Sequence, residues 1–174
     1  MHFTIEKSME ILERTPSVLR ALLTGIHADW VMSNEGPDTF SPFDVVGHLI
    51  YGEQTDWAVR ARIILEWGTE KPFEPWDRLA MYELSREKTL EQLLEEFEST
   101  RKDNLDWLKS RNITDEDLDK TGIHPDLGEV TLRNLLATWV VHDLTHIAQI
   151  TRVMAKQYKE EIGPWPKYFR ILEF

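Results

Sequence analysis

The chain has 174 residues, a length typical of one folded domain, so we expect residues 1–174 to form a single unit. Its formal net charge of −11 repels phosphate backbones, and we therefore expect no nucleic-acid partner. The absence of cysteine excludes disulfides, thiolate zinc sites, iron–sulfur clusters and a cysteine nucleophile. The sequence shows neither an apolar run of the ~20 residues that a membrane helix needs nor a signal-peptide core, so a cytoplasmic protein without a membrane partner is expected.

Helical periodicity divides the chain into four long stretches. They cover residues 4–26, with a kink at Thr15-Pro16, then 41–67, beginning at Ser41-Pro42, then 84–109, and finally 131–159. Gly163-Pro164 ends the last stretch, and residues 165–174 are expected to form a short closing helix. Elsewhere only the neighbourhood of residues 129–131 has faint strand character. The pattern predicts an all-α four-helix bundle.

Three histidines stand out against the apolar faces of two of these helices. His142 and His146 lie on the same apolar arc of the last helix, four residues apart, so both imidazoles can reach one metal ion. His48 lies close to the apolar stripe of the second helix. Three neutral nitrogen donors from two facing helices predict a divalent metal site with a position left for water or a ligand. The alternative is that these are hydrogen-bonded core histidines without a metal.

The donor set limits the identity of the metal only loosely. Three imidazoles suit zinc, nickel, iron and copper, and zinc or nickel is the expected ion. Because imidazoles must be neutral to coordinate, metal affinity is expected to fall as the pH drops through about 6. The run from His142 to His146 invites comparison with the H-E-x-x-H motif of zinc peptidases. Asp143 stands where that motif has its general-base glutamate, so a peptidase is disfavoured.

Four further polar or small residues lie beside these histidines and have two interpretations each. Asp56 and Asp143 fall on apolar arcs of their helices. Each carboxylate either accepts a hydrogen bond from the second ring N–H of a histidine ligand or pairs with a tryptophan, a tyrosine or an arginine such as Arg60. Gly52 leaves room either for the metal's free position or for a neighbouring tryptophan. Gln149 lies at the margin of the histidine face, where it either touches a bound ligand or is a polar rim residue.

The aromatic residues bear on assembly and on the walls of a pocket. Seven tryptophans exceed the evident need of one small core and favour a buried subunit interface, so we expect a homodimer. Tyr51 and Trp139 each lie about one turn from a predicted metal ligand. They are candidate pocket walls, and ordinary core residues are the alternative.

The sequence resembles the DinB superfamily (DinB/YfiT-like) of metal-binding four-helix bundles over nearly its whole length. The resemblance is carried by His48, by H-D-L-T-H-I-A-Q-I at residues 142–150, by H-P-D-L-G-E-V-T-L-R-N-L-L at 124–136 and by G-P-W-P-K-Y-F-R-I-L at 163–172. It implies an up-down-down-up bundle, often a homodimer, with a divalent metal on three histidines. Residue by residue, these correspond to His48, His142 and His146.

The resemblance also implies a range of activities. Some members are thiol S-transferases that act with bacillithiol, mycothiol or glutathione, and others are described as metal-dependent hydrolases. The expectation is therefore a metal-dependent enzyme that activates a small-molecule thiol or water. Since the chain has no cysteine, an attacking sulfur would come from a low-molecular-weight thiol. The alternative is a metal-containing stress-response or ligand-binding protein without catalytic turnover.

Overall fold

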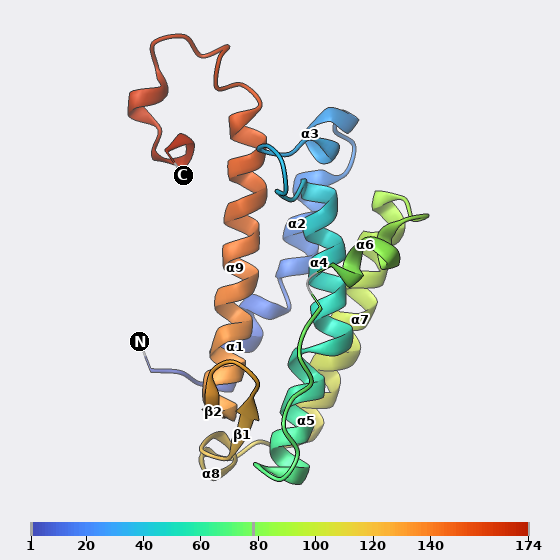
Figure 1. Cartoon of the computed structure of the whole chain (residues 1–174), viewed down its shortest axis with the longest axis vertical. Coiled ribbons are helices and arrows are strands. Elements are labelled where there is room, and N and C mark those ends of the chain that lie inside the picture. The colour runs from blue at the N-terminus through green and yellow to red at the C-terminus, as the bar shows by residue number, and fades with distance from the viewer. Residues whose placement is uncertain (1, 78, 174) are drawn as a thin grey trace.

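The structure, a computed structural model, describes residues 2–77 and 79–173 and consists mainly of four helical columns (Figure 1). The columns are α1 (Ile5–Leu12) with α2 (Thr15–Leu23), α4 (Pro42–Thr55) with α5 (Trp57–Trp67), α7 (Leu90–Ser110), and α9 (Leu132–Lys156). The first and last columns run in one direction and the middle two run in the opposite direction (Figure 1). The predicted all-α, up-down-down-up four-helix bundle is confirmed.

Two of the predicted helices are each divided by a short break, and the third, predicted from residue 84, begins only at Leu90, because Thr89 caps it there. The first breaks between Leu12 and Thr15, and Pro16 lies in the first turn of α2, where its missing N–H leaves no hydrogen bond unmade. The second was predicted to be continuous over 41–67, which is wrong, because Asp56 leaves the helical region with φ −112° and ψ −85°. Its backbone N–H still donates to Gly52 and its carbonyl accepts from Arg60, so the column continues through the bend.

Short elements connect the columns. They are α3 (Ala28–Met32), α6 (Ala80–Ser85), α8 (Asp115–Leu118), and an antiparallel hairpin of β1 (Thr121–His124) and β2 (Gly128–Thr131), which pairs Thr121 with Thr131 and His124 with Gly128. The sequence indicated strand character only near β2. In β1, Gly122 packs so closely on α5 that an added Cβ would lie 2.8 Å from Ile64. Glycine weakens the strand signal in a sequence, which explains why β1 was not predicted.

The last segment differs from the expected closing helix. After α9 the chain turns away and comes back beside that helix as two 3-10 turns, η1 (Pro166–Tyr168) and η2 (Arg170–Leu172) (Figure 1). Two prolines, Pro164 and Pro166, remove backbone donors that an α-helix over this segment would need. Leu172 of η2 is buried, which anchors the returning segment.

The connection between the second and third columns runs the length of the bundle. Because α4–α5 and α7 run in the same direction, the chain after Gly68 must return from the end of α5 to the start of α6 (Figure 1). Phe73 is buried on the way, where its backbone N–H donates to the carbonyl of Ile123 in β1. This return path carries Trp76 past the second column.

The bundle interior consists of two apolar clusters with a charged group between them. One cluster includes Trp57 and Trp139, and the other includes Leu49 and Phe97. The guanidinium carbon of Arg101 lies 4.9 Å from the ring centre of Phe97 and 5.2 Å from that of Trp139, so it separates the two clusters. Within the described residues, no helix is both long and apolar enough to cross a bilayer.

Candidate metal centre

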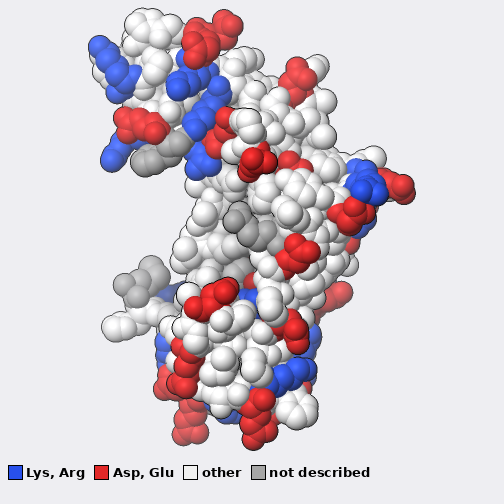
Figure 2. All heavy atoms as spheres, in the orientation of Figure 1, with Lys and Arg blue, Asp and Glu red and all other residues white. Residues whose placement is uncertain are grey.

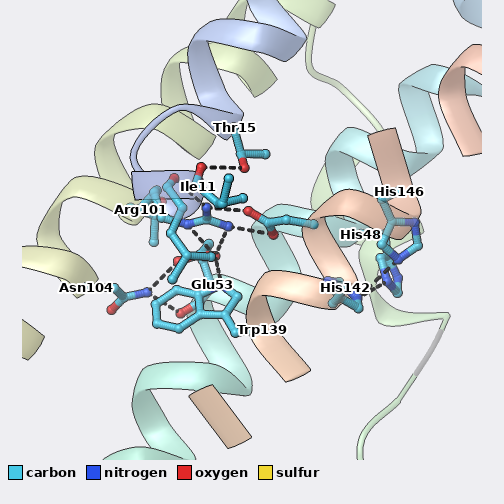
Figure 3. A network of polar contacts seen from close by, with 12 residues as sticks. Ile11, Thr15, His48, Glu53, Arg101, Asn104, Trp139, His142 and His146 are labelled. Atoms are coloured by element: carbon cyan, nitrogen blue, oxygen red, sulfur yellow. Dashed lines mark hydrogen bonds and ion pairs between the residues drawn. The ribbon is translucent and has the colours of Figure 1, made fainter. Parts of the chain in front are cut away.

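The three predicted histidines meet between α4 and α9. Nε2 of His142 lies 3.0 Å from Nε2 of His48 and 3.1 Å from Nε2 of His146. One ring nitrogen from each residue can be chosen so that all three lie within 4.8 Å of one another. Figure 3 shows the rings pointing toward one another from the two helices. The i and i+4 spacing on α9 places His142 and His146 on one face, as the sequence predicted.

The surroundings keep two of these rings neutral. Burial, together with the neighbouring His146 and His48, lowers the pKa of His142 to about 2. Burial also lowers the pKa of His146, against the opposing effect of its hydrogen bond with Gln149. Neutral imidazole is the form that binds a metal ion.

Gln149 determines which nitrogen of His146 carries the proton. Its amide oxygen Oε1 lies 2.8 Å from Nδ1 of His146 and accepts the Nδ1–H. Nε2 of His146 is then unprotonated, with its lone pair directed toward the other two histidines. Gln149 therefore lies at the rim of the histidine face, as the sequence indicated, and its side chain is hydrogen-bonded to His146. It orients a candidate ligand from one turn away on the same helix.

Trp57 explains two neighbouring features that the sequence left open. A Cβ on Gly52 would lie 3.1 Å from Nε1 of Trp57, so this glycine makes room for the tryptophan and not for a metal-bound ligand. The Trp57 ring stacks on Trp139 with centroids 6.0 Å apart, and Trp139 is fully buried, so the suggestion that Trp139 forms a pocket wall is wrong. The edge of His142 also packs on Trp57, at 4.9 Å.

A cleft of about 430 Å³ opens in front of the histidines. One side consists of aromatic rings, since His48 lies 5.0 Å from Trp76 and 5.6 Å from Phe40 between ring centres. Tyr51 contacts Trp76 from behind, at 5.4 Å, and does not itself line the cleft. The rest of the lining, here called the polar side of the cleft, consists of Glu35, Asp38, Thr39, Gln149 and Arg152.

Comparison with known proteins identifies the family. The model of the DinB superfamily matches residues 11–150. The chain belongs to the DinB superfamily. Among solved structures, this DinB chain is similar to YfiT from Bacillus subtilis, with 23% sequence identity, a TM-score of 0.76 and 90% of each chain covered. That protein is described as a probable metal-dependent hydrolase with an unusual four-helix bundle topology. The similarity between the two chains is one of fold. No curated protein sequence is significantly similar to the chain.

Behind the histidines, the DinB bundle buries a network of charged groups around Arg101 (Figure 3). The Arg101 guanidinium donates to Glu53 Oε1 at 2.7 and 2.9 Å, to the two carboxylate oxygens of Asp143 at 2.6 and 3.0 Å, and to the carbonyl of Leu12 at 2.8 Å. Asn104 and Trp139 donate to the Glu53 carboxylate at 2.9 and 3.1 Å. Each carboxylate thus has several donors, as burial requires.

This network decides the role of Asp143 and reveals residues that the sequence did not single out. Asp143 is fully buried and pairs with Arg101, so it follows the interpretation of a paired core carboxylate. Burial raises the pKa of Glu53 even though Arg101 opposes it. Burial alone would lower the pKa of Arg101, but the Glu53 and Asp143 carboxylates outweigh that effect and raise it. Glu53 and Arg101 were not singled out from the sequence. Each is a charged residue at an apolar position of its helix, and this pattern could have revealed them.

Asp56 has a separate partner on α5. Its carboxylate lies 3.1 Å from the guanidinium of Arg60, one turn further along the chain. Burial raises the pKa of Asp56 to about 6, although the positive charge of Arg60 opposes the shift. The interpretation of Asp56 as a paired core carboxylate, with Arg60 as its partner, therefore agrees with the structure.

Proposed function

We propose that His48, His142 and His146 hold one divalent metal ion, zinc or nickel, and that the cleft in front of them is the active site of a metal-dependent enzyme. The observation that carries the proposal is the convergence of three imidazole nitrogens, with Gln149 fixing the proton of His146 on the far side of its ring. When bound, such an ion supplies Lewis-acid chemistry that lowers the pKa of water or of a thiol.

The residues of the chain have separate tasks in this proposal. Three neutral ligands leave the full positive charge of an ion available to an anionic nucleophile. Phe40 and Trp76 give the cleft an apolar wall, beside which fewer water molecules can screen electrostatic interactions. Since the chain contains no cysteine, the nucleophile is water or a low-molecular-weight thiol. The reaction is therefore hydrolysis or S-transfer, and the description of YfiT as a metal-dependent hydrolase supports the first.

Metal analysis tests the proposal directly. Protein purified without an affinity tag is expected to contain one equivalent of metal, and His142→Ala should lose it while the far-UV circular dichroism spectrum stays helical. His124→Ala, in the hairpin, is the matched control and should keep the metal. With cobalt as the ion, a small thiol should produce a thiolate-to-metal charge-transfer band. Full metal content in His142→Ala would show that the ligand assignment is wrong.

We also propose that the protein is a homodimer. The outer face of α9 exposes apolar side chains, with Val141 61% and Leu144 47% accessible. Figure 2 shows a hollow with few charged residues between the returning C-terminal segment and the N-terminal residues. An exposed apolar surface of this kind is typical of subunit interfaces. Light scattering that gives the monomer mass of 20.5 kDa at micromolar concentration would contradict the proposal.

A further inference from the structure

One arginine lies on the polar side of the cleft, on the same helix as two of the histidines. Arg152 follows His146 by six residues and Gln149 by three, and all three line the cleft. At a rise of about 1.5 Å per residue, the backbone of Arg152 is about 9 Å along the helix axis from that of His146. The cleft therefore has the candidate metal centre at one end and a guanidinium toward the other.

Glu35 holds this guanidinium in a fixed orientation. Arg152 donates from Nε to Glu35 Oε1 at 2.7 Å and from Nη2 to Oε2 at 2.9 Å. Lys156 also lies 3.3 Å from Glu35 Oε1. The hydrogen bonds from Arg152 and Lys156 outweigh burial and lower the pKa of Glu35, so this carboxylate is a poor proton acceptor. Glu35 is therefore a positioning residue and a poor candidate for a general base.

The bidentate pair leaves donors of Arg152 unused. A guanidinium has five N–H groups, and Glu35 takes two of them. Among the described residues, no other hydrogen-bond acceptor is found for the remaining three. The second carboxylate of the cleft, Asp38, is exposed at the rim, where water screens its charge. A planar, oriented guanidinium with free donors is suited to bind a carboxylate.

We propose that Arg152 recognises an anionic group, in the simplest case a carboxylate, on the substrate of this cleft. The substrate's reacting group would lie at the histidines and its apolar body would pack against Phe40 and Trp76. The assignment of one end of the substrate to the histidines rests on the proposed function, whereas anion binding by Arg152 does not require it. The substrate class is thus a small molecule with an apolar spacer between a reactive group and a carboxylate.

Calorimetric titration with a matched pair of probes tests this proposal. The full-length protein, as purified and with its metal content measured, is titrated with 4-phenylbutyrate and with 4-phenylbutanol, which differ in charge. The wild type should bind the carboxylate about tenfold more tightly than the alcohol, and Arg152→Gln should lose this preference. Arg133→Gln, which removes an arginine of the same helix that pairs with Asp119, is the control and should keep it.

The outcomes separate the possible roles of Arg152. A carboxylate preference that disappears in Arg152→Gln supports the proposal even if the protein contains no metal, in which case only the proposed function fails. No preference in the wild type, or an equal preference in Arg152→Gln, overturns the proposal even if the metal is present. If Arg152→Gln keeps the preference, the Arg152–Glu35 pair only holds the loop before α4. The substitution would then change the stability of that loop and leave the ratio of the two affinities unchanged.

Discussion

Replacing Arg101 by methionine would leave two buried carboxylates without their shared cation. Arg101→Met removes all five hydrogen bonds that the guanidinium donates, four of them to Glu53 and Asp143. Removing one partner of a buried ion pair typically costs about 3–5 kcal/mol, because the remaining charge is desolvated and unpaired. We expect a loss in this range at pH 7, a large part of the 5–15 kcal/mol by which typical domains are stable.

The loss should depend on pH in a defined direction. Without Arg101, burial is less opposed and raises the pKa of Glu53 further above that of the unfolded chain. The folded variant then retains a proton that the unfolded chain releases, so its stability falls as the pH rises. The difference from the wild type should be largest at pH 7–8 and smaller toward pH 5. Adding Glu53→Gln should recover part of it, since one buried charge is then absent.

Urea unfolding followed by far-UV circular dichroism between pH 5 and 8 measures these differences. Arg86→Met is the control, because Arg86 forms a solvent-exposed pair with Glu83, and it should change stability by no more than about 0.5 kcal/mol. An Arg101→Met loss below about 1 kcal/mol, or one that is the same at pH 5 and pH 8, would refute the account of the buried network.

Two further predictions concern Asp56 and Gln149. Burial raises the pKa of Asp56 to about 6, so the folded protein holds this proton more tightly than the unfolded chain and loses stability as the pH rises from 4 to 7. Asp56→Asn cannot titrate, and urea unfolding should show its stability rising relative to the wild type by up to about 2–3 kcal/mol over that range. Gln149→Leu removes the acceptor of the His146 Nδ1–H and should weaken metal affinity about 10- to 100-fold in a chelator competition, with the helical signal unchanged.

Each of these predictions has a clear contrary result. A stability difference between Asp56→Asn and the wild type that does not vary with pH would show that Asp56 titrates normally. Gln157→Leu, at the end of α9 and away from the histidines, is the control for Gln149→Leu and should bind metal normally. Equal metal affinities of the two glutamine variants would rule out an orienting role for Gln149.

The columns and the histidine cluster could be predicted because their signals are local. Ser41 and Thr131 cap the helices that begin after them, and each side-chain hydroxyl accepts a hydrogen bond from the backbone N–H three residues on. The spacing of His142 and His146 fixes their common face without any knowledge of the neighbouring helix. To predict that His48 joins them, one need only assume that the apolar stripe of its helix faces the same core.

The buried network and the cleft were hidden because they depend on partners from distant segments. Glu53 and Arg101 are 48 residues apart, and a charged residue at an apolar position reveals its partner only when the packing of α4 on α7 is known. Phe40 and Trp76 belong to connections without helical periodicity, so no pattern places them beside His48. Glu35 lies in a turn-rich loop and meets Arg152 across 117 residues.

The cleft is built from two kinds of segment, the bundle helices and the long connection between α5 and α6, and these can change independently. The histidines are fixed on α4 and α9, which the bundle core holds, whereas Trp76 comes from the long connection that two parallel columns require. Lengthening such a connection costs little conformational entropy, about 0.6 kcal/mol for each doubling. Insertions and substitutions there can therefore reshape the aromatic wall without disturbing the histidines, so relatives with the same three ligands can diverge in the molecules they accept.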